Sequence, residues 1–145
     1  MNTDLAKARE LLDAGGCTGV LCRGDETVVW DSHGLRELVG LLKSGKELAG
    51  FSAADKVVGR AAALLYRAAG VSQLYAQVAS AAALATLGAA QIPAQAGERV
   101  ASILNRSRDG LCPMESATAD TDDPQLALGR IADFLARLPQ PTQLE

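Results

Sequence analysis

The chain has 145 residues and a formal net charge of -3; 48% of its residues are hydrophobic but only 3% are aromatic. This length fits one domain, whose core must be filled mainly by Ala, Leu and Val. The charge gives no reason to expect nucleic acid as a partner, and every apolar run is shorter than the ~20 residues of a membrane span.

Charges and cysteines indicate the compartment. Four charged residues interrupt any apolar signal segment near the start of the chain: Asp4, Lys7, Arg9 and Glu10. The cysteines are three, an odd number without dense spacing: Cys17, Cys22 and Cys112. Both features favour a cytoplasmic protein with reduced thiols.

The first part of the chain predicts a helix and a hairpin. Apolar residues follow helical spacing over 3–14, and Gly15-Gly16 ends that element. Extended runs at 17–23 and 27–30 flank a Gly-Asp pair, which is typical of a hairpin. On one regular strand Cys17 and Cys22 would face opposite sides, so they are poor partners for a shared metal.

A second helix is expected at 35–43, followed by a central helix at 51–70 around which the rest should pack. Ser52 takes the N-cap position and Asp55 that of a capping-box acid, while Gly70 ends the element. Gly59 would then lie in mid-helix, where a glycine costs about 1 kcal/mol relative to alanine, so another backbone should approach it.

The remainder continues the strand–helix alternation. Residues 73–78 alternate as a strand, so strand–helix–strand order implies at least one parallel pair. Ser80 caps a helix that ends near Gly88, and 90–94, which contains Pro93, should lie at a sheet edge. We expect a helix at 98–105, an irregular segment, and a last helix opened by Asp123-Pro124 with a buried apolar stripe.

These elements predict one α/β domain over residues 1–138, followed by a tail at 139–145. The expected architecture is a three-layer α/β/α sandwich with a mixed sheet of four or five strands and helices on both faces.

The element order and the phrases A-D-K-V-V-G-R-A-A-A-L-L and C-P-M-E resemble the family DUF1893, from the first helix to about residue 123. The resemblance implies a cytidine-deaminase-like fold without an assigned activity. Zinc deaminases place His- or Cys-x-Glu at one helix start and Pro-Cys-x-x-Cys at the next. Here the expected starts carry Ser52 to Lys56 and Ala79 to Ala83, which offer no zinc ligand set.

We therefore expect no metal, no zinc-dependent deamination and no cofactor; a zinc site from Cys112, Cys22 and the lone His33 is rejected.

Asp55 is a candidate general base and Lys56 a candidate anion holder. The alternative is a capping box beside an exposed basic face. Cys112 is the third candidate, a nucleophile or oxidation sensor, or else a packed loop cysteine.

The leading hypothesis is a small-molecule-binding protein, for a nucleotide-like or anionic metabolite, with a site between two serine-capped helix starts and the Cys112 loop. Its candidate binding residues are Ser52, Ser80, Asn105, Arg106 and Glu115. The alternative is a non-catalytic domain that self-associates through alanine-rich faces. A homo-oligomer is expected in either case.

Overall fold

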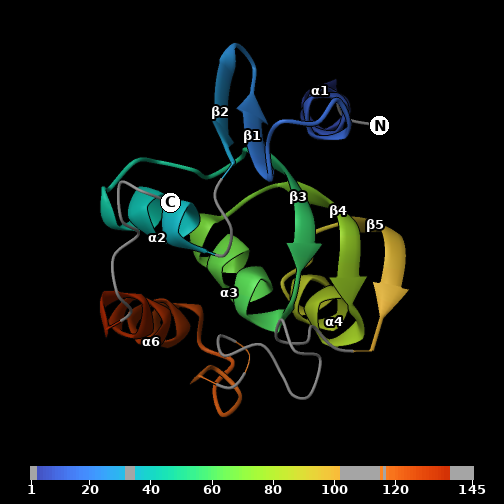
Figure 1. The fold of residues 1–145 in the computed structure, drawn as a ribbon. Coiled ribbons are helices and arrows are strands. Elements are labelled where there is room, and N and C mark those ends of the chain that lie inside the picture. Colours follow the sequence, from blue (N-terminus) through green and yellow to red (C-terminus); the bar gives the residue numbers. More distant parts are fainter. Residues whose placement is uncertain (1–2, 32–34, 102–114, 116, 138–145) are drawn as a thin grey trace.

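A five-stranded mixed sheet forms the centre of the chain in the computed structural model, which describes residues 3–31, 35–101, 115 and 117–137 (Figure 1). The strands are β1 (Gly19–Arg23), β2 (Glu26–Trp30), β3 (Ser52–Val58), β4 (Gln73–Ser80) and β5 (Ala94–Val100). Their order is β2-β1-β3-β4-β5. Strand β1 is antiparallel to both β2 and β3, whereas β3, β4 and β5 run parallel.

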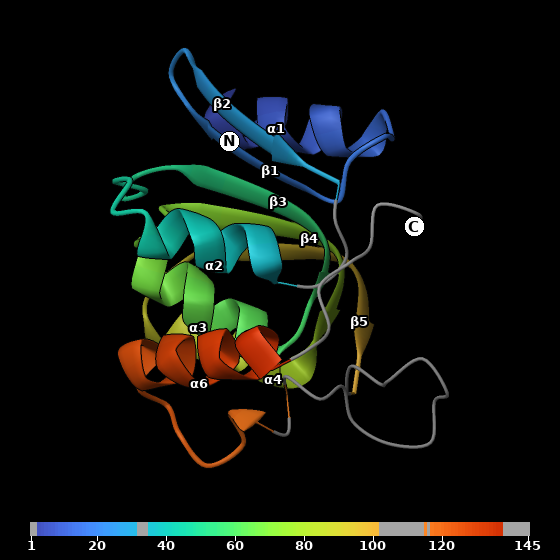
Figure 2. The same ribbon diagram turned by 60° about the vertical axis from the view of Figure 1, so that its left-hand side comes forward.

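Helices cover both faces of this sheet. They are α1 (Thr3–Asp13), α2 (Arg36–Lys43), α3 (Arg60–Ala69), α4 (Ala81–Ala89) and α6 (Pro124–Arg137). Helix α1 lies on one face, against β1 and β3, and the others gather on the opposite face, where α3 packs between α4 and α6 (Figures 1 and 2). The α/β class with a mixed sheet is therefore confirmed.

The prediction of one helix over 51–70 is wrong in its first half. Residues Ser52–Val58 form β3, and the helix begins only at Arg60, with Gly59 as its N-cap in an extended conformation. Because α1 covers one face of β3 and α3 the other, small residues on both sides of the strand are buried, which removes the alternation that marks a strand. Gly70 ends α3 as expected, in a left-handed conformation with φ 77°.

The second error concerns β5. Residues 98–100, expected to start a helix, belong to this strand, which lies at the edge of the sheet beside β4. An edge strand is exposed on much of both faces, so its polar residues carry no period of two. The hairpin, the parallel pair, the helix capped by Ser80 and the helix opened by Pro124 are confirmed.

The core has two parts, one on each face of the sheet. The larger lies under α3 and includes Phe51, Leu65 and Tyr66, and the smaller lies under α1. Cys17 and Cys22 are both free and both pack in the smaller part, contrary to the expectation of opposite sides, because β1 begins only at Gly19. Within the described residues, no helix is long and apolar enough to cross a membrane.

Candidate functional site

Helices α3 and α4 start at the same end of the sheet, because each follows one of two neighbouring parallel strands. Val58 at the end of β3 pairs with Ala79 near the end of β4. Ser80 caps α4, since its Oγ accepts a hydrogen bond from the N–H of Ala83 at 3.1 Å. In open α/β sheets, ligands bind beyond the carboxyl ends of the strands, where such helix starts meet.

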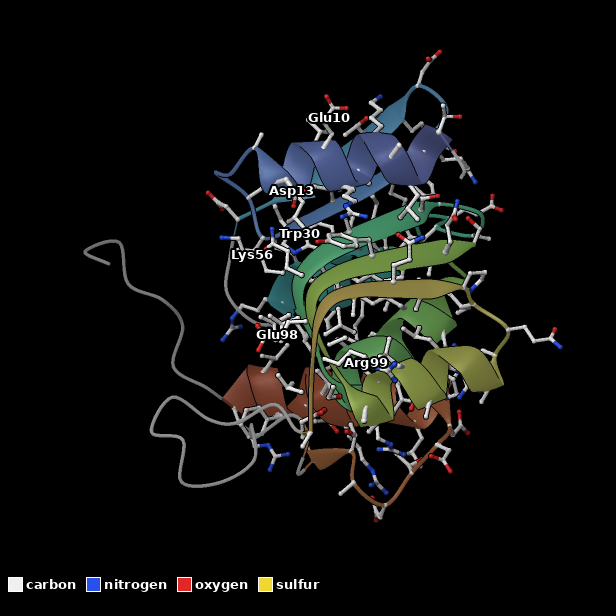
Figure 3. All side chains as sticks on the ribbon, turned by 90° about the vertical axis from the view of Figure 1, so that its right-hand side faces the viewer. Glu10, Asp13, Trp30, Lys56, Glu98 and Arg99 are labelled. Atoms are coloured by element: carbon white, nitrogen blue, oxygen red, sulfur yellow. The ribbon has the colours of Figure 1, made fainter. Side chains whose placement is uncertain are left out.

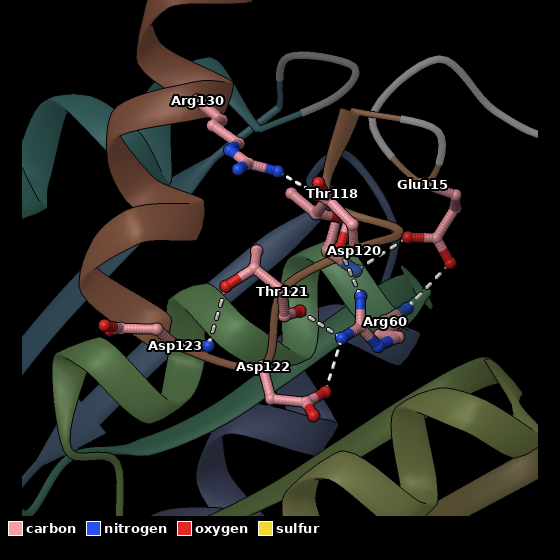
Figure 4. Close-up of polar contacts among 9 residues, drawn as sticks. Arg60, Glu115, Thr118, Asp120, Thr121, Asp122, Asp123 and Arg130 are labelled. Atoms are coloured by element: carbon pink, nitrogen blue, oxygen red, sulfur yellow. Dashed lines mark hydrogen bonds and ion pairs between the residues drawn. The ribbon is translucent and has the colours of Figure 1, made fainter.

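The start of α3 already holds a carboxylate, that of Glu115. Its Oε1 accepts a hydrogen bond from the N–H of Arg60 at 2.8 Å, and its Oε2 accepts one from the N–H of Ala61 at 2.6 Å (Figure 4). A negative group is stabilised here by both the free N–H groups and the helix dipole. Glu115, from the phrase C-P-M-E, therefore serves as the cap that Ser52 was expected to provide.

The Arg60 side chain ties the same segment to the helix. Its guanidinium donates to the carbonyl oxygens of Thr118 and Thr121 and pairs with Asp122 at 2.5 Å (Figure 4). A second ion pair joins Asp120 to Arg130 of α6. Residues 115 and 117–122 thus lie across the start of α3, fixed by one partly buried arginine.

Replacing Glu115 by Ala should lower the free energy of unfolding by about 1–2 kcal/mol, because two N–H groups lose a charge-assisted acceptor. Glu115→Gln, which keeps one amide oxygen, should lose less. Urea unfolding of both variants measures the effect, and Glu10→Ala on the exposed face of α1 is the control (Figure 3). An Ala variant as stable as the wild type would show that the two bonds contribute little.

Asp55 and Tyr66 form a hydrogen-bonded pair between β3 and α3. The Tyr66 hydroxyl is fully buried and donates to Oδ2 of Asp55 at 2.6 Å. Oδ1 of the same carboxyl accepts a longer bond from the N–H of Val57, at 3.4 Å. Asp55 as a residue is only partly exposed, and its carboxyl is enclosed by the fold, where Tyr66 and backbone N–H groups of β3 hold it.

Burial sets the titration of this pair. Desolvation raises the pKa of Asp55 from 3.8 to about 7, although the bond from Tyr66 and backbone N–H groups act in the opposite direction. Burial, followed by the neighbouring carboxylate, raises the pKa of Tyr66 well above its ordinary value. Tyr66 therefore remains a donor at neutral pH, and Asp55 is the group that gains or loses a proton there.

The structure separates several residues that the sequence placed together. Ser52 begins β3 and accepts a bond from the Gln73 side chain at 3.3 Å, so it caps no helix and lies at the opposite end of the strands from Ser80. Asp55 completes no capping box. Lys56, its neighbour on the strand, lies on the convex face of the bent sheet, whereas Asp55 faces α3 (Figure 3). The two cannot act on one small substrate.

Sequence reasoning missed Tyr66 and Arg60. The signal that could have revealed them is Val57-Val58-Gly59, a β-branched pair and a glycine that end a strand just before the true helix start. Asn105, Arg106, Cys112 and His33 lie outside the described residues. Burial raises the pKa of the Cys22 thiol, despite a hydrogen bond with Thr27, so this cysteine is a poor nucleophile.

The observed helix starts do not fit a zinc site. They carry Gly59, Arg60 and Ala61 at α3, and Ser80, Ala81 and Ala82 at α4, which offer neither imidazole nor thiolate. Among the residues that the structure describes, no group of three or more His, Cys, Asp or Glu could hold a metal ion.

Comparison with known proteins gives a family and a fold. The family model described as "Domain of unknown function (DUF1893)" matches residues 7–135. The crystal structure of a DUF1893 family protein from Thermotoga maritima superimposes with a TM-score of 0.83 at 22% sequence identity, covering 92% of this chain and 91% of that one. The search of curated proteins found no match.

Proposed function

This chain belongs to the DUF1893 family, a domain of unknown function, and from its own chemistry we propose that it binds a small molecule and can exchange a proton with it through Asp55. The observation that carries the proposal is the Asp55–Tyr66 pair, with its 2.6 Å hydrogen bond and a carboxyl pKa of about 7. A general acid or base is most effective when its pKa lies near the working pH.

The roles of the two groups differ. Asp55 takes the proton from the bound molecule or returns it, because its carboxyl has a pKa of about 7. Tyr66 is a positioning residue: its hydroxyl fixes Oδ2 of Asp55, while Oδ1 accepts the longer bond from the N–H of Val57. An aspartate with a purely structural role more commonly forms an ion pair. Among the described residues, no charged group contributes to the rise in the pKa of Asp55.

The ligand class follows from the neighbouring helix start. Glu115 shows by its own contacts that the N–H groups of Arg60 and Ala61 suit a carboxylate. We infer that an anionic metabolite, nucleotide-like or phosphorylated, approaches this end of β3 and competes with Glu115. We also propose Cys112 as a candidate nucleophile of this ligand site.

The fold supports a distant relation to cytidine deaminases, which we also propose. Those enzymes place their chemistry at two neighbouring helix starts, and α3 and α4 begin side by side after parallel strands. Because the starts carry no zinc ligands here, the chemistry proposed for this chain is acid–base and does not use zinc.

A screen of nucleosides, nucleotides and phosphorylated metabolites tests the proposal by thermal shift at pH 6 and pH 8. A true ligand should stabilise the protein and move the ¹³Cγ resonance of Asp55, and both effects should weaken in Asp55→Asn and Tyr66→Phe. Asp25→Asn, in the exposed hairpin turn, is the matched control. A panel without ligands, or ligands that bind both variants unchanged, would reject the site.

A second candidate function, a non-catalytic self-associating domain, is favoured by the outer face of α4. Four of the five alanines of α3 are buried, but α4 exposes a face made only of small residues: Ala81, Ala82, Ala85, Gly88 and Ala89. Small side chains permit close contact between helices. If this face joins two copies, Ala85→Arg should convert a dimer to a monomer in light scattering, while Ala136→Arg on the exposed side of α6 should not. A monomeric wild type would remove this candidate.

A further inference from the structure

A buried indole N–H lies near the Asp55 carboxyl, on the same face of the sheet. Trp30 is 7% exposed, and its side chain belongs to the core under α3. Its Nε1–H donates no hydrogen bond to any of the residues that the structure describes. Buried indole N–H groups usually have an acceptor, so this donor requires one that the described residues do not supply.

Gly19 brings this donor close to Asp55. The glycine pairs with Trp30 of β2 on one side and with Asp55 of β3 on the other, so the three positions share one face. A Cβ on Gly19 would lie 2.4 Å from Nε1 of the indole, which therefore reaches over β1 where the strand has no side chain. Directly paired residues place their Cβ atoms about 5 Å apart, so Nε1 lies within about 8 Å of the Cβ of Asp55.

The Asp55 carboxyl can accept a further hydrogen bond. Its oxygens already accept bonds from the Tyr66 hydroxyl and from backbone N–H groups of β3. An ionised carboxylate has about four acceptor sites, so at least one stays open. Trp30 and Asp55 do not bond to each other, so a group that joins them must carry an acceptor for the indole and a donor for the carboxylate.

We propose that Trp30 is a specificity-determining residue of the Asp55 site, and that the two side chains together bind a carboxamide, with its carbonyl oxygen toward the indole N–H and its own N–H toward the carboxylate. A carboxamide holds an acceptor and a donor on neighbouring atoms, and these atoms span a wider gap than a single hydroxyl does. The inference rests on the proposed function, because it names the neutral group of the ligand that Asp55 holds. The anionic group of the same ligand would lie beyond it, toward the start of α3.

Three neutral probes of equal size test the proposal: propionamide, 2-butanone, which lacks the N–H donor, and 2-butanol, which offers a single hydroxyl. Each is titrated at pH 8, above the pKa of Asp55, into ¹⁵N-labelled protein, where the single tryptophan gives one indole N–H signal. We expect millimolar binding of propionamide with a downfield shift of the indole proton, and at least about fivefold weaker binding of the other two probes. Equal affinity for all three, no binding of propionamide, or an indole signal that does not move, would overturn it.

A pair of variants locates the effect. Trp30→Phe keeps an aromatic ring and removes the donor, so propionamide should bind about fivefold more weakly to it. Tyr75→Phe, which removes a polar atom from a buried aromatic side chain on the opposite face of the sheet, is the matched control and should bind like the wild type. If Trp30→Phe does not fold, the indole signal of the wild type still decides.

The ¹³Cγ resonance of Asp55 separates this inference from the function on which it rests. A metabolite that moves this resonance but leaves the indole signal of Trp30 unchanged would reject the role of Trp30 and retain that of Asp55. A panel of metabolites and probes that moves neither signal would reject both. Movement of both signals by propionamide, and of neither by 2-butanone at the same concentration, is the result that we expect.

Discussion

Asp55→Asn should flatten the fall in stability that the wild-type protein undergoes between pH 4 and pH 8. The pKa of Asp55 rises from 3.8 to about 7 on folding, so between these values the folded chain holds a proton that the unfolded chain has lost. Stability from this group is complete below pH 3.8 and is lost as the pH rises through about 7. At 1.36 kcal/mol per pKa unit, the loss is up to about 4 kcal/mol.

The measurement is the free energy of unfolding in urea at several pH values for the variant and the wild type. The advantage of Asp55→Asn over the wild type should grow with pH, by up to about 4 kcal/mol, because Asn fills the same space and still accepts the Tyr66 bond. Asp25→Asn should give a curve parallel to the wild type. Parallel curves for Asp55→Asn as well would show that its carboxyl titrates normally in the folded chain.

Tyr66→Phe separates burial from hydrogen bonding at the same site. The Tyr66 bond lowers the pKa of Asp55 against the larger effect of desolvation, so its removal should raise that pKa further. The ¹³Cγ titration of Asp55 by NMR reads this directly. A pKa that falls toward 3.8 in Tyr66→Phe would mean that water enters and solvates the carboxyl, and that Tyr66 acts mainly by excluding it.

Surface elements could be predicted well from the sequence because each has one buried face. Helix α1, with Leu5, Ala8 and Leu12 buried, and the hairpin around Gly24 show the expected spacings. The buried strand β3 could not be predicted, because F-S-A-A-D-K has a weak β-propensity and both faces are covered. A strand of small residues between two helices has no local signature, and tertiary packing decides its conformation.

The sequence identified some residues of the candidate site but not their arrangement. Asp55 was identified as a candidate general base at the expected helix start and Glu115 as a candidate binding residue near Cys112, and both make defined contacts. Their partners Tyr66 and Arg60 follow only once the chain is known to turn at Gly59, since that turn folds α3 back over β3. An error of seven residues in the helix start therefore placed Ser52 and Lys56 at a site that they do not share.

Gly19→Ala should destabilise the protein by about 3 kcal/mol, because β1 has no room for a side chain at this position. A Cβ on Gly19 would lie 2.1 to 2.4 Å from three atoms of the Trp30 indole, which lies over the glycine from the neighbouring strand. Trp30 is only 7% exposed and belongs to the core under α3, so its ring cannot move without disturbing packed neighbours.

Gly40→Ala is the matched control and should have the opposite sign. Gly40 lies inside α2, where an added Cβ meets nothing within 4 Å, so Ala should stabilise the helix by about 1 kcal/mol. Urea unfolding measures both effects, and the fluorescence of Trp30, the single tryptophan of the chain, should shift to the red only in Gly19→Ala. If Gly19→Ala kept wild-type stability and emission, the Trp30 indole would have to lie farther from Gly19 than it does in the structure. The sheet could then accept a side chain at position 19, which pairs with Asp55.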